Sequence, residues 1–304
     1  SHGGGLLTGV LAGLAAGALW GIVFVAPRMV SGLTAVDFTA GRFVSCGAFS
    51  VLLMLVLRKS SLPSGAQALS ALGMSVLGFT GYYLLLVYAI ADAGTEVPSL
   101  IIGTIPIWVM LLGKPAHLRW SALLPGMLLT LLGLGLMMNS QHGALQAASG
   151  SLWRGVGLAV LALVSWTVYA VLNGKWLQKH PEVSAADWAN WMGVATGAGA
   201  LLLWLVAGTP VDSLPNWQVA GDKYAWLAII SVAMGVGASW LATVWWNMAS
   251  QRLSASLCGQ LIVSETIFGL LYSFAWDGQW PSVLQATACV CFVAGILFSI
   301  RAHR

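Results

Sequence analysis

Ten long apolar runs constrain this chain more than any other feature of its sequence. A helix needs about 20 mostly apolar residues to cross the hydrocarbon core of a bilayer. Prolines and glycines separate runs of about that length, and a transmembrane barrel would alternate apolar and polar residues instead. The sequence therefore predicts an all-α polytopic membrane protein with ten transmembrane helices, at residues 6–25, 38–57, 69–91, 97–113, 122–138, 152–172, 188–207, 224–247, 255–276 and 283–300.

The composition excludes the water-soluble classes of protein. Hydrophobic residues make up 59% of the 304 residues and charged residues only 7%, whereas soluble domains carry about 25% charged residues. The four cysteines lie inside apolar runs, none with a CxxC spacing, and are interpreted as packing residues rather than metal ligands. Residues 1–5 lack an initiator methionine and are interpreted as a tag remnant.

The basic residues predict that both termini are cytoplasmic. With the N-terminus inside, nine Lys and Arg residues fall on the inner side and three on the outer side, which agrees with the positive-inside rule. The inner nine are Arg58, Lys59, Lys114, Arg119, Lys175, Lys179, Arg252, Arg301 and Arg304, and the outer three are Arg28, Arg154 and Lys223. We expect a multi-pass protein of the bacterial inner membrane, with no affinity for nucleic acid.

Short matches between the two halves predict an inverted repeat. Ala18-Leu19-Trp20 in the first run resembles Val164-Ser165-Trp166 in the sixth. With five runs in each half, the second half enters the membrane upside down, and such repeats place a substrate site at their interface. The predicted parts are residues 6–139 as the first five-helix repeat, 140–151 as an extracytoplasmic linker and 152–304 as the second repeat.

The chain resembles the EamA-type branch of the drug/metabolite transporter (DMT) superfamily. The resemblance rests on Ala18-Leu19-Trp20-Gly21, on Pro106 and on Glu265-Thr266-Ile267-Phe268-Gly269, and Thr266 replaces a proline that is common in the family. Within this branch, the tryptophan-rich chain is similar to the YddG-type aromatic amino acid exporters. The resemblance implies an inner-membrane exporter whose central cavity is lined mainly by spans three, four, eight and nine, with spans one and six as movable walls.

Two ionisable residues fall inside the predicted membrane region, where such groups are costly and are candidates for function. Arg42 lies near the start of the second run, and we expect it to snorkel to the outer surface or to pair with Asp37 or Glu96. Glu265 lies near the middle of the ninth run. It can exchange a proton, meet a substrate ammonium group or serve as a hydrogen-bonding helix contact.

The other candidates are neutral polar and aromatic residues at helical spacing. Each also has a structural reading as a packing or hydrogen-bonding contact between helices, but together they predict one central cavity with aromatic walls. With Glu265, the predicted substrate-binding residues are Trp20, Tyr82, Tyr83, Thr104, Trp108, Trp166, Ser239, Trp240, Thr243, Trp246, Gln260 and Ser264.

These features favour a secondary transporter that exports neutral amino acids, aromatic and other apolar ones, by alternating access. Phosphate-bearing substrates need basic residues in the cavity, and the sequence offers only Arg42, placed near the surface. Desolvation favours a neutral Glu265, so facilitated transport is expected, with no cofactor and no catalytic or metal-binding residues. A monomer suffices for this plan, and a dimer is left open. The alternatives are a proton-coupled exporter of other metabolites or drugs that uses Glu265, and an integral-membrane enzyme.

Overall fold

A computed structural model describes residues 2–26, 34–57, 61–94, 96–139, 151–210 and 217–304, and within these ranges the regular structure is entirely helical. The first half contains α1 (His2–Gly21), the 3-10 helix η1 (Ile22–Phe24), α2 (Ala35–Val56), α3 (Gly65–Ser75), the π-helix η3 (Val76–Thr80), α4 (Gly81–Ala93), α5 (Glu96–Gly103), α6 (Ile105–Leu112) and α7 (Trp120–Asn139). The second half contains α8 (Leu152–Lys179), α9 (Ala185–Ala207), α10 (Trp217–Met234), the π-helix η6 (Gly235–Leu241), α11 (Ala242–Arg252), α12 (Ala255–Leu261), α13 (Val263–Asp277) and α14 (Val283–Ala302).

The lengths of these helices suit a polytopic membrane protein. Within the described residues, eight helical segments are long and apolar enough to cross a membrane, and Gly5–Gly21 and Val97–Leu112 are shorter apolar helices. These segments coincide with the ten predicted runs, and most of their ends agree to within about four residues. The tenth run begins at residue 283 in both descriptions, because Ser282 caps α14 and accepts a hydrogen bond from the backbone of Gln285.

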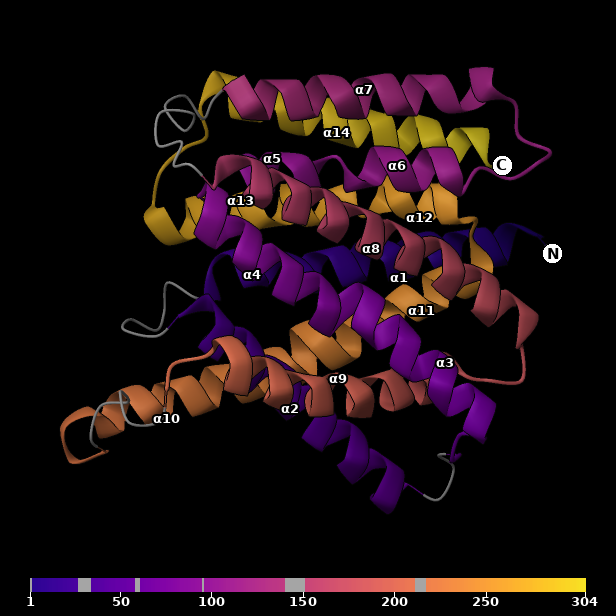
Figure 1. Ribbon diagram of the computed structural model, residues 1–304. Coiled ribbons are helices and arrows are strands. Elements are labelled where there is room, and N and C mark those ends of the chain that lie inside the picture. The colour runs from indigo at the N-terminus through magenta and orange to yellow at the C-terminus, as the bar shows by residue number, and fades with distance from the viewer. Residues whose placement is uncertain (1, 27–33, 58–60, 95, 140–150, 211–216) are drawn as a thin grey trace.

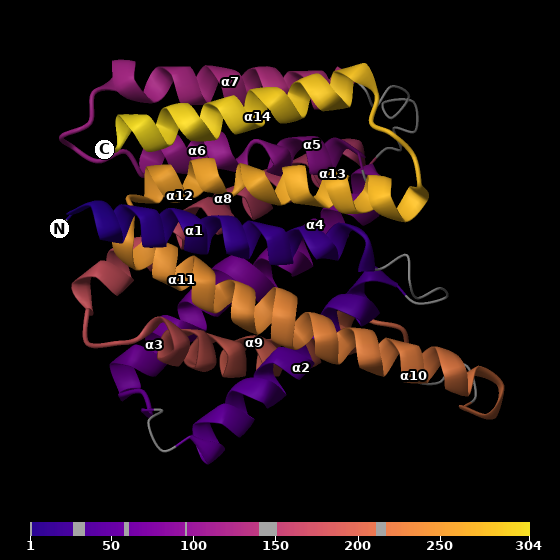
Figure 2. The same ribbon diagram turned by 180° about the vertical axis from the view of Figure 1, so that it is seen from behind.

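Most helices run along one long direction, with α2, α3 and α4 oblique to it, in a bundle with two recognisable sides (Figure 1). The pair α7 and α14 covers one side, and α2, α9 and α10 lie at the opposite side, as the view from behind also shows (Figure 2). Between them lie α1, α4, α8, α11, α12 and α13. Both chain termini lie at the same end of the bundle, which we call the termini end; the opposite end is called the far end.

Glycines allow close helix crossings in this bundle. Helices α2 and α9 make the most extensive contact, and a Cβ atom on Gly47 would lie only 2.9 Å from Cα of Gly197. At the crossing of α1 with α13, a Cβ atom on Gly21 would lie 2.9 Å from the backbone nitrogen of Gly269. Small residues at such crossings let backbones approach closely, which is how helices in membranes gain packing energy.

Four of the membrane segments are interrupted near mid-length, and the interruptions come in two kinds. The π-helices η3 and η6 break the regularity of the third and eighth segments. The fourth segment breaks at Thr104 between α5 and α6, because Pro106 has no N–H to donate to the carbonyl of Ile102. The ninth segment breaks at Ile262 between α12 and α13. This break forms even though Thr266 replaces the proline that is common at this position in the resembled family.

Candidate functional site

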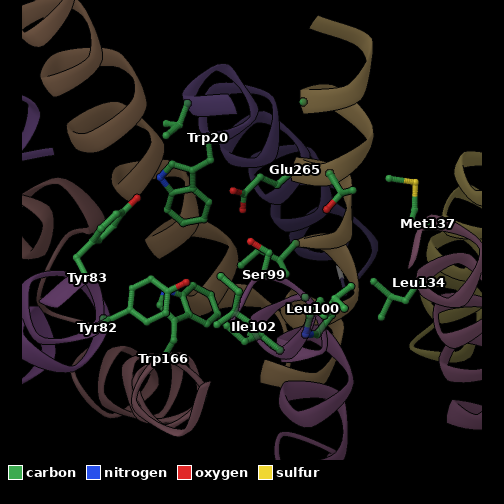
Figure 3. A pocket seen from close by; sticks show the side chains of 18 of the residues that line it. Trp20, Tyr82, Tyr83, Ser99, Leu100, Ile102, Leu134, Met137, Trp166 and Glu265 are labelled. Carbon is green, nitrogen blue, oxygen red and sulfur yellow. The ribbon is translucent and has the colours of Figure 1, made fainter. Parts of the chain in front are cut away.

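A cavity of about 550 Å³ opens beside three of the interrupted segments, the third, fourth and ninth, and extends from the middle of the bundle to the far end. Its walls come from α1, α2, η3, α4, α5, α6, α7, α8 and α13. Figure 3 shows the side chains that point into it, with the aromatic rings of Tyr82, Tyr83 and Trp166 on one side and Leu134 and Met137 on the other. The carboxylate of Glu265 lies between these two groups.

Arg42 lies inside this cavity, which corrects the prediction that it reaches the outer surface. Its side chain is only 4% exposed and lines the cavity, about 10 Å along α2 from the first residue of that helix. The guanidinium carbon lies 4.7 Å from the ring centre of Phe43 and 5.8 Å from that of Tyr83, both within cation–π range. Among the described residues, Nε of Arg42 has no hydrogen-bond partner.

The predicted surface partner of Arg42 is occupied elsewhere. The Asp37 carboxylate accepts hydrogen bonds from the indole of Trp204 at 2.8 Å, from the backbone nitrogen of Thr209 at 2.9 Å and from Thr34. These bonds fasten the start of α2 to the end of α9 at the far end of the bundle. Because the Asp37 carboxylate accepts these hydrogen bonds, it does not pair with Arg42. The guanidinium of Arg42 contacts the aromatic rings beside the cavity instead. The side chain of Glu96, the other predicted partner, lies outside the described residues.

Glu265 contributes the second ionisable group of the cavity. It lies in the first turn of α13, directly after the break at Ile262, and its side chain lines the same space as Arg42. The described residues provide no hydrogen bond or ion pair for its carboxylate. Arg42, which the sequence placed near the surface, therefore shares the cavity with Glu265. The cavity combines one cation and one acid in an otherwise uncharged lining.

A connected cluster of aromatic rings forms the wall and the closed inner end of the cavity. Phe43 packs edge-on against Tyr83 at 5.4 Å between ring centres, and Tyr83 packs against Tyr82 at 5.6 Å. Trp166 contacts Trp246 at 5.9 Å, and Trp246 contacts Trp20 at 5.7 Å. Four of the predicted residues, Trp20, Tyr82, Tyr83 and Trp166, line the cavity, whereas Trp246 is buried directly behind them.

Two predicted residues lie at the break in the fourth segment. Thr104 stands between the cavity-lining residues Gly103 and Ile105, and its hydroxyl donates a 2.7 Å hydrogen bond to the carbonyl of Ile101. The indole of Trp108 donates to this hydroxyl at 3.2 Å. The Trp108 ring is 46% exposed on the outside of α6, so it supports the break from the surface rather than from the cavity.

The remaining predicted residues lie away from the main cavity. Ser239 and Thr243 border a second space of about 10 Å³ between α2, α9 and η6. The indole of Trp240 donates to Asn190 of α9 at 2.7 Å. Gln260 donates to Thr130 of α7 at 2.8 Å and accepts from Ser299 of α14 at 2.9 Å. Ser264 is buried and faces Gly17 where α1 crosses α13.

A buried polar network joins three helices near the termini end of the bundle. The indole of Trp188 donates to Asn173 Oδ1 at 2.7 Å, and Asn173 Nδ2 donates to Asn247 Oδ1 at 3.2 Å. Trp176 stacks between His180 and Trp188, with ring centres 4.0 and 3.8 Å apart. These contacts join α8, α9 and α11 on the side of the aromatic cluster away from the cavity.

Several lining residues escaped the sequence analysis. Phe79 and Tyr169 extend the aromatic cluster from η3 and α8, and Ser99 and Leu134 line the cavity from α5 and α7. Apart from the aromatic rings, these are ordinary residues of apolar helices, and nothing in the sequence distinguishes them. Among the described residues, no group of three or more His, Cys, Asp or Glu side chains is placed to hold a metal ion.

Comparison with known proteins agrees with this fold. The model of the EamA-like transporter family matches residues 7–140 and 153–301. The inner membrane protein YtfF of Escherichia coli is 31% identical over 98% of this chain and 96% of its own length, and the uncharacterized transporter YdfC of Bacillus subtilis is 23% identical over 83% and 78%. A solved crystal structure, 21% identical, has a TM-score of 0.77 and covers 96% of this chain and 97% of its own. The chain belongs to the EamA-like transporter family, a family of membrane transporters within the DMT superfamily.

Proposed function

We propose that this protein is a secondary transporter that exports neutral amino acids with apolar or aromatic side chains by alternating access. The observation that carries the proposal is the presence of Arg42 and Glu265 in one aromatic cavity. An α-carboxylate and an α-ammonium group are the two charges of such a substrate. A guanidinium binds a carboxylate through two parallel hydrogen bonds, and a carboxylate and aromatic faces bind an ammonium group.

The balance of charge supports a substrate without net charge. The described lining carries one basic side chain, Arg42, and one acidic side chain, Glu265, and its other residues are neutral. A zwitterion can therefore enter and leave without a proton to balance it, and we propose facilitated transport down the substrate gradient. A single arginine is a poor match for a substrate with several phosphate charges, which disfavours nucleotide-sugar or sugar-phosphate carriers.

The packing of the helices supports the predicted inverted repeat. If α1 corresponds to α8, α2 to α9 and α7 to α14, the pairs α2–α9 and α7–α14 map onto themselves, and both pairs pack extensively. The packing of α1 on α11 then corresponds to that of α8 on α4. The π-helices η3 and η6 fall in corresponding segments, as do the breaks at Thr104 and Ile262. Interrupted helices at corresponding places of two repeats are typical of transporter sites.

The orientation follows from the charges of the loops. With both termini cytoplasmic, the far end faces the outside, so the cavity is accessible from outside and the network of Asn173 closes the cytoplasmic end. The predicted extracytoplasmic linker comprises residues 140–151, of which residues 140–150 lie outside the described residues. We propose that one chain is sufficient for transport, since a single bundle encloses the cavity.

The proposal is tested by counterflow of labelled leucine into proteoliposomes. Arg42→Gln and Glu265→Gln each remove one charged contact, worth about 1.5–3 kcal/mol, so we expect a loss of about 10- to 100-fold in leucine counterflow. Arg154→Gln is the matched control, because Arg154 is 73% exposed and pairs with Asp92 at the far end. Unchanged flux in Arg42→Gln, or no flux of any neutral amino acid in the wild type, would overturn the proposal.

The alternative is a proton-coupled exporter of other metabolites or drugs, and one observation favours it. Glu265 shares the open cavity with Arg42, so its carboxyl group is placed to take up and release a proton during the cycle. Uphill substrate movement driven by an imposed pH gradient, and abolished in Glu265→Gln, would replace facilitated transport by this alternative. An integral-membrane enzyme is a less favoured reading, because the chain belongs to a family of transporters.

A further inference from the structure

The cavity has two chemically different ends. The end near Arg42 carries the aromatic rings, as Figure 3 shows for Tyr82, Tyr83 and Trp166. Beyond Glu265, the opposite end is formed by aliphatic and thioether side chains from three helices. We call these five residues the apolar end: Leu100 of α5, Leu134, Met137 and Met138 of α7, and Leu270 of α13.

Helix α7 provides most of the apolar end because of how it packs. It lies along α14 at one side of the bundle (Figure 1) and has fewer contacts with α6. Leu134 and Met137 also pack on a core cluster of Val263, Ala288 and Phe292. The two side chains are therefore held on one flank by α13 and α14, while their other flank borders the cavity.

We propose that the apolar end is the subsite for the substrate side chain, and that it selects zwitterions with a large apolar side chain over small ones. This inference rests on the proposed function. With the carboxylate at Arg42 and the ammonium group at Glu265, the side chain of an amino acid points away from the ring cluster and toward Leu134 and Met137. Methionine side chains are flexible and polarizable, so they adapt to aliphatic chains and rings of different shape.

The subsite predicts a measurable preference. Burial of apolar surface is favourable by about 0.8 kcal/mol per CH₂ group, and leucine has three more carbons than alanine, so leucine should bind about 10- to 100-fold more tightly. Alanine uses the two charged contacts but does not reach the apolar end. The ratio of leucine to alanine affinity therefore reports on the subsite, and the affinity for alanine reports on the charged contacts.

The test is competition by unlabelled leucine or alanine against labelled leucine counterflow in proteoliposomes. Met137→Gln keeps the length of the side chain but adds a polar amide, and we expect it to lower the leucine-to-alanine ratio about 10-fold. Met137→Leu keeps the position apolar and should leave the leucine-to-alanine ratio close to that of the wild type. Leu134→Ala should lower the leucine-to-alanine ratio about 3- to 10-fold. Leu132→Ala is the matched control, because the Leu132 side chain lies on the same helix and is 54% exposed. Thermal unfolding identifies any variant that fails to fold.

The outcomes separate this inference from the proposed function. If the wild type binds alanine and leucine equally well, or if Met137→Gln and Leu134→Ala both fold and leave the ratio unchanged, the subsite assignment is wrong while amino acid transport stands. The same conclusion follows if a lipid chain fills the apolar end, because the ratio then does not respond to either variant. If neither amino acid is transported, the proposed function fails, and this inference fails with it.

Discussion

At the scale of single residues, the buried polar side chains divide by whether they already have partners. Gln260 is fully buried, and its amide bonds Thr130 and Ser299 on two neighbouring helices. Arg42 is nearly as buried, yet its Nε has no hydrogen-bond partner among the described residues. Buried polar groups are normally paired, so an unpaired one beside a cavity is a candidate for binding a ligand, whereas a paired one holds helices together.

We therefore predict that Gln260→Ala affects stability rather than selectivity. The substitution leaves the Ser299 hydroxyl without its acceptor and opens a void between α7, α12 and α14, at a cost of about 1–3 kcal/mol. In detergent, the midpoint of thermal unfolding should fall by roughly 5 °C. Gln279→Ala, at an exposed position, serves as the control. A changed leucine-to-alanine ratio with unchanged thermal stability would place Gln260 in the substrate site instead.

At the scale of the elements, helix interruptions shape the cavity. A continuous α-helix directs its side chains at a fixed 3.6-residue period, and a π segment or a break changes which residues face the same way. η3 lies where Gly78 and Phe79 line the cavity, and the break beside Pro106 lies where Ile102, Gly103 and Ile105 line it. Three interruptions, η3 and the breaks at Thr104 and Ile262, therefore lie at the wall that the substrate is proposed to contact, whereas η6 borders the smaller second space.

Gly78 provides a direct test of this element. A Cβ atom there would lie 2.6 Å from Cγ of Tyr169, so Gly78→Ala must displace the ring that packs on η3. Overpacking of this kind costs about 1–3 kcal/mol, and we predict a lower thermal midpoint together with slower leucine counterflow. Gly73→Ala, in the same membrane segment, meets no atom within 4 Å and should be neutral or slightly stabilising. Equal behaviour of the two variants would mean that the fit of Tyr169 against η3 is unimportant.

At the scale of the whole molecule, the two ends of the bundle differ. The cavity extends to the far end, while Asn173, Trp188 and Asn247 join three helices at the termini end. Alternating access requires the second end to open when the first closes. In the proposed cycle, opening the termini end would break the hydrogen bonds of this network, so we expect the network to set part of the free-energy difference between the two states.

We predict that Asn173→Ala makes the termini end open more often. The indole N–H of Trp188 loses its acceptor, which costs the closed state about 1–3 kcal/mol. The native Cys258, 2% exposed at the termini end of α12, is the reporter, in a protein whose other cysteines are replaced by alanine. Its labelling rate with a maleimide should rise about 5-fold or more. Asn139→Ala, exposed at the far end, is the control, and an unchanged rate in Asn173→Ala would exclude the network as a closing contact.

The sequence by itself determined the class of protein and the position of the membrane helices. Run length is a local property: about 20 apolar residues satisfy the hydrocarbon core wherever they occur, and proline or glycine ends the run. It also identified Trp20, Tyr82, Tyr83, Trp166 and Glu265 as candidates, because indoles, phenols and an acid inside a membrane stand out from an apolar background.

Only the tertiary structure decided which way each helix faces. Nearly all residues of these helices are apolar, so the sequence gives no amphipathic period to show which face meets lipid and which meets the interior. Arg42 consequently lies in the cavity rather than at the surface, and Gln260 lies between helices rather than in the cavity. Leu134 and Met137 border the cavity only because α7 packs beside α14. In a membrane, packing between helices rather than polarity along each helix sets these orientations.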